Sequence, residues 1–257
     1  MPAETLPSAT GEPRRVALVT GASGLIGREA CLALAQAGVV VVGTFNRRRE
    51  AAMETGQRIE ELGGKFFPIH ASLTGSPSAP QDCLAEVERV AGAPDIMVAC
   101  AGVKQRRPLL ATRPGDLEAL ASLNIVATIE LARLVLRKVV RRGWGRIVLM
   151  GSRAGTLGMP GQAAYAATQA ALSGWASSAA FEVGRRGVTV NVVAPGAVQD
   201  PADATYSAAE AARVQELIGC GRLGTAAEIA AVIAFLCSSA ASYVNGATIS
   251  VDGGARY

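Results

Sequence analysis

A glycine-rich turn near the N-terminus has the residue types and spacing that bind phosphate. The stretch VALVTGASGLIG places Gly21, Gly24 and Gly27 between an apolar, β-branched run and a segment with helical spacing. Glycines there permit a tight turn and close backbone approach to a pyrophosphate, and a helix beginning near Leu25 offers free N–H groups to the same anion. The turn predicts a dinucleotide site; a plain strand-to-helix turn is the alternative.

The end of the second apolar run bears on which dinucleotide is bound. An Asp or Glu there would accept the ribose hydroxyls of NAD, whereas arginine matches a 2′-phosphate through charge-assisted hydrogen bonds. The segment reads GTFNRRRE and carries Arg47, Arg48 and Arg49 with no acid before them. The sequence therefore favours NADP(H) over NAD(H), with Arg47 as the best single candidate; arginines that only solvate a helix start are the alternative.

Alternating strands and helices must hold these groups in place. Strand-like runs lie at residues 15–20, 39–44, 65–70, 95–100, 146–151, 188–193 and 247–251. Segments with helical spacing separate most of them, and continuous apolar strands between helices indicate a parallel sheet covered on both faces. The pattern predicts an α/β fold, a single Rossmann-type doubly wound parallel sheet of about seven strands flanked by helices.

The length of 257 residues and the 50% hydrophobic content fit one domain. We expect a disordered leader over residues 1–13, because that stretch has no apolar core, and a dinucleotide-binding domain over 14–257. The least patterned stretch, about 197–220, follows a strand and contains a short helical segment, which is typical of a lid over a site.

Composition argues against several other classes of function. The net charge of +4 includes no basic block that indicates nucleic acid, and a single His with five scattered cysteines gives no metal-ligand spacing. We expect no signal peptide and no apolar run of membrane-spanning length, and hence a cytoplasmic protein with reduced thiols. The expected partner is a small-molecule or carrier-protein-tethered carbonyl substrate, with no nucleic acid, no membrane and no metal.

From about residue 15 to the C-terminus the chain resembles the short-chain dehydrogenase/reductase family, particularly members similar to 3-oxoacyl-carrier-protein reductases. The resemblance includes the glycine turn, CAG at 100–102, SLNIVAT, MGSRAG, AAYAATQAA, VNVVAPG at 190–196 and the ending RLGTAAEIAAVIAFLCSSAASYVNGATISVDGG. It implies that Ser152 positions a carbonyl, that Tyr165 passes its proton to the oxygen as hydride arrives, and that Asn124 completes a proton relay through water. The family's lysine, which holds the nicotinamide ribose and lowers the tyrosine pKa, is Gln169 here.

The resemblance also implies a set of cofactor contacts. These are Gly21, Ser23, Gly24, Leu25, Ile26, Arg47, Ser72, Ala101, Gly102, Pro195, Gly196 and Val198. Several of the surrounding positions depart from the family pattern. Leu25 replaces a glycine, Ser72 replaces an adenine-contacting Asp, Ala99 and Cys100 replace asparagines, and Asp200 stands near the place of a carboxamide-binding Thr.

Gln169 changes the expected chemistry of Tyr165. A neighbouring cation favours tyrosinate by ~1–3 pKa units, so without one the phenol pKa should lie closer to its free value of about 10. A neutral tyrosine is the form that donates a proton, which favours carbonyl reduction over alcohol oxidation. Gln169 can still hydrogen-bond a ribose hydroxyl. Arg153 or Lys104 is a candidate for the missing charge; a solvated side chain is the alternative for each.

Three functions remain open from the sequence. The first is an NADPH-dependent ketoreductase acting on an acyl or polyketide-like substrate. The second is a non-redox catalyst of cyclisation, dehydration or isomerisation, and the third is a non-catalytic subunit. The resemblance implies a homo-oligomer, tetramer or dimer, and a hetero-oligomer with a related chain is an alternative. The basic segment 133–142 is a candidate surface for an acidic carrier protein, with a solvated helix as the alternative.

Overall fold

The computed structural model describes residues 14–200 and 208–256. The strands are β1 (Val16–Thr20), β2 (Val40–Phe45), β3 (Phe66–His70), β4 (Ile96–Ala99), β5 (Gly145–Met150), β6 (Val188–Pro195) and β7 (Thr248–Val251). The α-helices are α1 (Leu25–Gln36), α2 (Arg49–Glu61), α3 (Ala79–Ala91), α4 (Pro114–Ala121), α5 (Thr128–Arg142), α6 (Ala154–Leu157), α7 (Ala163–Val183), α8 (Ala208–Glu216) and α9 (Ala226–Cys237). Short turns of helix are η1 (Leu109–Ala111), η2 (Ser122–Ala127), η3 (Gly184–Arg186) and η4 (Ser239–Ala241).

The strands form one parallel sheet in the order β3-β2-β1-β4-β5-β6-β7. After β3, at one edge of the sheet, the chain crosses back to place β4 beside β1, so the strand order reverses between β1 and β4. In such sheets ligands bind outside the carboxyl ends of the strands at the reversal. The expected doubly wound α/β fold is confirmed, and the observed strands overlap all seven expected runs.

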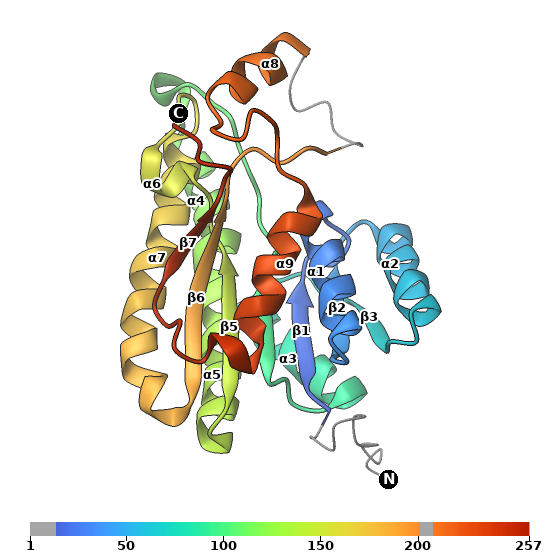
Figure 1. The fold of residues 1–257 in the computed structure, drawn as a ribbon. Helices are drawn as coiled ribbons and strands as arrows, with labels where there is room; N and C mark the ends of the chain where they lie inside the picture. The colour runs from blue at the N-terminus through green and yellow to red at the C-terminus, as the bar shows by residue number, and fades with distance from the viewer. Residues whose placement is uncertain (1–13, 201–207, 257) are drawn as a thin grey trace.

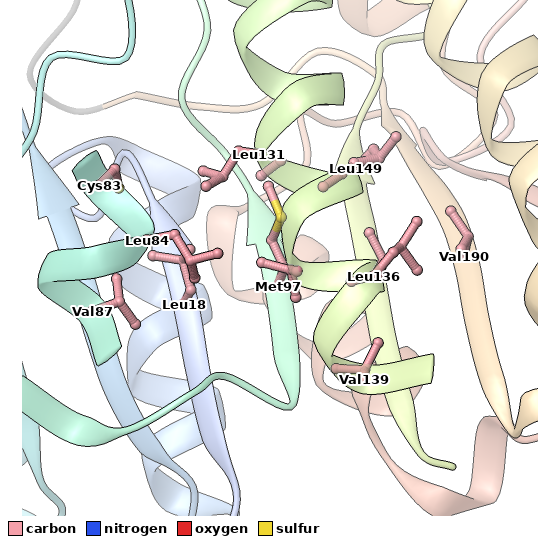
Figure 2. Packing of buried hydrophobic residues seen from close by; sticks show 14 of the residues in the cluster. Leu18, Cys83, Leu84, Val87, Met97, Leu131, Leu136, Val139, Leu149 and Val190 are labelled. Carbon is pink, nitrogen blue, oxygen red and sulfur yellow. The ribbon is translucent and has the colours of Figure 1, made fainter. Parts of the chain in front are cut away.

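Each face of the sheet carries its own core because successive strand residues point to opposite faces. Leu18 and Met97 pack with α3, α5 and α7 on one face, as Figure 2 shows for the α3 and α5 side. Ala17 and Val19 pack with α1 and α9 on the other. The two layers of helices are visible in Figure 1, with α9 and α1 in front of the sheet and α5 behind it. This double burial fixes the carboxyl ends of the strands as a rigid platform.

One helical run contradicts the expectation of no apolar run of membrane-spanning length. Residues Pro114–Arg142 are long and apolar enough to cross a membrane by length and composition, with a mean hydropathy of 1.7 over a window that is 44% buried. In the fold, Leu131, Val135 and Val139 of this run are fully buried in the core under the sheet. The run has the position of a core helix.

The segment after β6 returns over the carboxyl edge of the sheet. Val198 pairs with Gly224, and α8 lies beyond the strand ends in Figure 1. The C-terminal residues tie the far end of this segment, since Cys220 N–H donates to the Gly253 carbonyl and Arg256 N–H to the Leu217 carbonyl. A lid over 197–220 stays a prediction. The expected leader over 1–13 and part of the lid lie outside the described residues.

Candidate active site

Three adjoining cavities lie at the carboxyl edge. The nucleotide cavity, of 680 Å³, is lined among others by Gly21, Ser23, Gly24, Asn46, Arg47, Arg48, Ala101 and Gly102. The catalytic cleft, of 290 Å³, is lined among others by Leu25, Ile26, Ser152, Tyr165, Pro195, Gly196 and Val198. A smaller inner cavity, of 140 Å³, is lined among others by Ala101, Gly102, Asn124, Tyr165 and Gln169. The inner cavity shares wall residues with both others, so the three cavities adjoin one another.

The glycine turn fits a pyrophosphate for reasons of backbone geometry. Gly21 has φ +69°, and a Cβ there would come within 2.9 Å of the Ala101 amide nitrogen. A Cβ on Gly27 would collide with the Gly21 carbonyl. Helix α1 begins at Leu25 with Gly24 as its N-cap and no side-chain cap, which leaves its first N–H groups without a helical partner. The turn is therefore a cradle that only glycine permits, facing uncapped amides.

Two arginines, rather than one, border the nucleotide cavity. Arg47 and Arg48 both line it, and the Arg48 guanidinium lies 3.9 Å from the position of a Cβ on Gly24. Arg49 lies instead in a separate depression with residues of α2 and β3. The sequence singled out Arg47 but had no means to rank three consecutive arginines, because their directions depend on where α2 begins.

Ser72 is the one proposed cofactor residue that the structure does not bring to these cavities. Its side chain is exposed, and its hydroxyl donates to the Thr74 carbonyl at 3.0 Å. Ala71, Leu73 and Thr74 line the nucleotide cavity in its place. The backbone after β3 directs the serine outward. This part of the nucleotide cavity is therefore lined mostly by apolar side chains and backbone atoms.

The loop after β4 forms the wall between the nucleotide and inner cavities. Ala101 N–H donates to the Thr20 hydroxyl at 3.0 Å, which fixes the loop to the end of β1. Cys100 lines both cavities, and burial raises the pKa of its thiol to about 12. At neutral pH this side chain is an uncharged, poorly nucleophilic thiol.

Ser152 and Tyr165 come from different elements and meet in the catalytic cleft. Ser152 follows β5 and accepts a hydrogen bond from the Ala154 N–H at 3.2 Å, while Tyr165 lies in the first turn of α7. Both side chains line this cleft. Burial raises the pKa of Tyr165 above its ordinary value, and the Ser152 side chain lowers it in part. The expectation of a value near the free phenol is therefore corrected upward, and the tyrosine is neutral at pH 7.

A network behind Tyr165 joins three elements. Asn124 lies in the π-helical turn η2, and its amide nitrogen donates to the Val103 carbonyl at 2.9 Å and to the Thr168 hydroxyl at 3.1 Å. Its oxygen accepts from the Val103 N–H at 2.9 Å. A π-turn of this kind is frequent at functional sites. Both polar atoms of the Asn124 side chain have protein partners, so this side chain holds the 103 loop in place at the wall of the inner cavity.

Thr168 is the junction of this network, and no motif in the sequence points to it. Its fully buried hydroxyl donates to the Tyr165 carbonyl at 2.8 Å and accepts from Asn124. The Gln169 amide also approaches it, at 3.4 Å. Gln169 is only 5% exposed and lines the inner cavity. The inner cavity, which Tyr165 also lines, therefore contains the neutral amide of Gln169.

The two candidate replacements for the missing cation differ in position. Arg153 Nε lies 2.5 Å from Asp252 Oδ2, and its Nη1 donates to the Ser250 hydroxyl at 2.9 Å. This guanidinium is committed to the C-terminal segment. Lys104 lines both the inner cavity and the catalytic cleft, the two that contain Tyr165.

Three basic side chains of α5 form ion pairs with acidic residues of α5 and of neighbouring segments. Arg133 binds Glu130, Lys138 binds Glu88 at 2.9 Å, and Arg142 lies 3.4 Å from Asp95. These pairs reduce the charge available to an acidic partner. Within the described part of the chain no group of three potential metal ligands occurs, and its five cysteines are free.

The chain is similar to known proteins over most of its length. A family model described as Enoyl-(Acyl carrier protein) reductase matches residues 21–256. The 3-oxoacyl-[acyl-carrier-protein] reductase FabG of Salmonella typhimurium is 36% identical over 242 residues, 93% of this chain and 96% of that protein. FabG of Escherichia coli is 37% identical with the same coverage. The structure is similar to a 3-oxoacyl (acyl-carrier-protein) reductase from Agrobacterium tumefaciens with NADP bound, with TM-score 0.87, 32% identity and 93% of both chains covered. It is also similar to acetoin dehydrogenase from Enterobacter cloacae, with TM-score 0.85, 31% identity and coverage of 93% and 94%.

Proposed function

The chain belongs to the short-chain dehydrogenase/reductase family, and from that premise we propose that it is an NADPH-dependent ketoreductase that reduces a carbonyl of an acyl or polyketide-like substrate. The observation that carries the proposal is the placement of Ser152 and Tyr165 in one cleft, beside an inner cavity that adjoins the glycine-turn cavity. The proton donor, Tyr165, and the dinucleotide site at the glycine turn then take part in the same reaction.

The chain's own residues fit NADP(H). The turn at Gly21 and Gly24 and the first amides of α1 hold the pyrophosphate, and Arg47 with Arg48 pairs with the 2′-phosphate. Bound NADPH supplies the hydride. Pro195, Gly196 and Val198 border the catalytic cleft together with Leu25 and Ile26 and would enclose the reacting end.

Ser152 and Tyr165 perform the proton chemistry. Ser152 donates a hydrogen bond to the substrate carbonyl and orients it, and the Tyr165 phenol transfers its proton to the same oxygen. Because burial raises the pKa of Tyr165, the phenol stays protonated at neutral pH, which is the form that reduction consumes. Without a cation at position 169 the tyrosinate needed for alcohol oxidation is disfavoured. Reduction is the preferred direction.

Gln169 replaces the family's lysine as a hydrogen-bonding group for the nicotinamide ribose. Its amide lines the inner cavity, where its donors and its carbonyl suit a ribose hydroxyl. It adds no charge. Lys104, which borders Tyr165 in both cavities, is the nearest candidate for a long-range cation, whereas the Arg153–Asp252 ion pair argues against Arg153.

In this proposal the substrate is an acyl group linked to its carrier through a thioester. Relatives named 3-oxoacyl-[acyl-carrier-protein] reductase support an acyl chain tethered to a carrier protein. The paired basic face of α5 gives little support to that helix as the docking surface. Assembly as a homotetramer or homodimer, a lid over 197–220 and a cytoplasmic location belong to the same proposal.

Cofactor binding is tested by titrating the purified chain with NADPH and NADH and following nicotinamide fluorescence. Micromolar NADPH binding that is much tighter than NADH binding is expected, because only NADPH carries the phosphate that Arg47 and Arg48 pair with. No detectable binding of either nucleotide would contradict the proposal.

A further inference from the structure

An arginine beside Ser152 reaches across the sheet to the C-terminal segment. Arg153 directly follows Ser152 and lines the catalytic cleft. Its Nη1 donates to the Ser250 hydroxyl at 2.9 Å, and its Nε lies 2.5 Å from Asp252 Oδ2. Ser250 is in β7, whereas Ser152 follows β5. Because β6 lies between these two strands, the Arg153 side chain joins strand ends that are not neighbours in the sheet.

Two backbone hydrogen bonds join the neighbouring strand ends at the same place. Arg153 N–H donates to the Pro195 carbonyl at 3.0 Å, and Gly196 N–H donates to the Val251 carbonyl at 3.0 Å. Pro195 and Gly196 are themselves walls of the catalytic cleft. The guanidinium therefore adds a direct link between the outer two of three strand ends, and Ser152 lies next to that link.

Asp252 extends the link to the residues that follow α8. Its Oδ1 accepts from the Gly254 N–H at 3.0 Å, which holds the carboxylate against the C-terminal turn. The Gly253 carbonyl accepts from the Cys220 N–H at 3.0 Å. The Gly254 carbonyl accepts from the Gly219 N–H at 3.3 Å. The position of the C-terminal turn is thus transmitted through one carboxylate to the loop that carries the serine.

The ion pair is largely shielded from water. The side chains of Arg153 and Asp252 are 17% and 10% exposed. The Nε contact is a contact between charges rather than an aligned hydrogen bond, and the Nη1 bonds to Ser250 and Thr156 set the direction of the guanidinium. When one charge of a shielded pair is removed, the other is left uncompensated. Replacing the carboxylate with an amide of the same shape therefore breaks the link.

We propose that Arg153 is a positioning residue for the reduction, which acts through Asp252 to hold the Ser152 hydroxyl where it meets the substrate carbonyl. This inference rests on the proposed ketoreductase function and adds a residue that touches no reacting atom. Arg153 is the middle residue of the turn in which Ser152 Oγ accepts from the Ala154 N–H at 3.2 Å. A shift of Arg153 therefore moves the serine, and a displacement of ~1 Å at a reacting group can cost about 100-fold in rate.

A purely structural ion pair is the alternative, and Asp95 provides the matched control. Its side chain is also shielded, at 13% exposed, and lies 3.4 Å from Arg142 and 3.7 Å from Arg15. Asp95 immediately precedes β4, so it lies at the amino ends of the strands, away from the site. Asp95→Asn should lower the free energy of unfolding and leave kcat unchanged.

The first test measures three quantities on wild type, Asp252→Asn and Asp95→Asn. They are kcat for acetoacetyl-N-acetylcysteamine by NADPH oxidation, the NADPH dissociation constant and the free energy of unfolding. We expect Asp252→Asn to lower kcat about 10- to 100-fold, with the NADPH dissociation constant within about twofold. Wild-type kcat in Asp252→Asn, at a temperature where the variant is folded, would overturn the inference.

A double variant covers the case in which Asp252→Asn does not fold. Arg153→Met combined with Asp252→Asn leaves no uncompensated charge, so it avoids the main cost of breaking the pair. It still lacks the link. The same 10- to 100-fold loss of kcat is expected, to order of magnitude, and wild-type kcat in this variant would overturn the inference.

A double-mutant cycle tests whether the ion pair acts through Ser152. The rate of NADPH oxidation is measured in single turnovers at high enzyme concentration for Ser152→Ala, alone and with Asp252→Asn. We expect the second change to alter the Ser152→Ala rate less than about threefold, because the hydroxyl that the ion pair positions is already gone. A further loss of about tenfold would mean that the two residues act independently, and would overturn the inference.

Hydrogen exchange separates this inference from the reductase proposal. If wild type reduces no thioester, the proposed function fails. Amide exchange is then compared by mass spectrometry in peptides that cover residues 150–157 and 217–220. The positional link still stands if Asp252→Asn speeds exchange in both peptides at least about threefold and Asp95→Asn does not. It falls if Asp252→Asn leaves exchange in these peptides unchanged.

Discussion

The nucleotide end and the catalytic end of the site are built in different ways. At the nucleotide end a local run of sequence does the work: a glycine turn, an uncapped helix start and adjacent arginines. At the catalytic end Asn124, Thr168 and Tyr165 are joined across η2, α7 and the 103 loop by side-chain hydrogen bonds. The first end depends on backbone shape and charge, the second on a buried polar network. Substitutions at the two ends should therefore separate cofactor affinity from turnover.

The largest effect should come from Tyr165→Phe. Removing the phenol hydroxyl leaves the substrate oxygen without its proton donor, and we expect kcat to fall ~10²–10⁴-fold. The NADPH dissociation constant should stay within about twofold, because the nucleotide end is untouched. Steady-state kinetics and fluorescence titration measure the two quantities. Tyr243→Phe, at a fully exposed ring, serves as the control. A variant that retains wild-type turnover would remove Tyr165 from the chemistry.

The next effect concerns Arg47 and Arg48. The double change Arg47→Ala with Arg48→Ala should weaken NADPH binding about 10- to 100-fold through the loss of charge-assisted hydrogen bonds. NADH binding should change little. Arg49→Ala is the matched control, since that side chain lines a different depression. Equal weakening of both nucleotides would show that the arginines do not read the 2′-phosphate.

Thr168→Val tests the network at the catalytic end. It removes a buried hydroxyl and leaves the Asn124 amide and the Tyr165 carbonyl each short of one partner. We expect the free energy of unfolding to fall by ~1–3 kcal/mol, measured by urea denaturation, and kcat to fall several-fold. NADPH affinity should hold. Ser178→Ala, at an exposed hydroxyl on the same helix, should change stability by less than about 0.5 kcal/mol. If the two variants behave alike, Thr168 is not a junction.

The smallest effect at neutral pH should follow Gln169→Lys. Reduction needs the protonated phenol, so the wild-type rate should fall only as pH rises through the raised pKa of Tyr165. A lysine would stabilise tyrosinate and move that alkaline limb down by ~1–3 pH units, with the rate at pH 7 preserved or higher. A pH–rate profile checks this. Collapse of activity at pH 7 would mean that the glutamine serves another mechanism.

The same contrast explains what could be predicted from the sequence. The strands, the turn at Gly21 and the start of α1 follow from local patterns, and all were anticipated. Thr168 and the Arg153–Asp252 pair were not assigned, because their partners are set by packing between distant elements. The outward position of Ser72 was not foreseen for a related reason, since the local backbone after β3 decides which side chain faces the cavity.

The most direct test of the account measures how many product molecules form for each NADPH oxidised. The chain is incubated with NADPH and acetoacetyl-N-acetylcysteamine, and nucleotide absorbance is followed while the product is identified by mass spectrometry. We expect one 3-hydroxyacyl thioester for each NADPH oxidised, with little reaction when NADH replaces NADPH. Product formed without NADPH oxidation, or no reaction at all, would contradict a ketoreductase that works with glutamine beside its tyrosine.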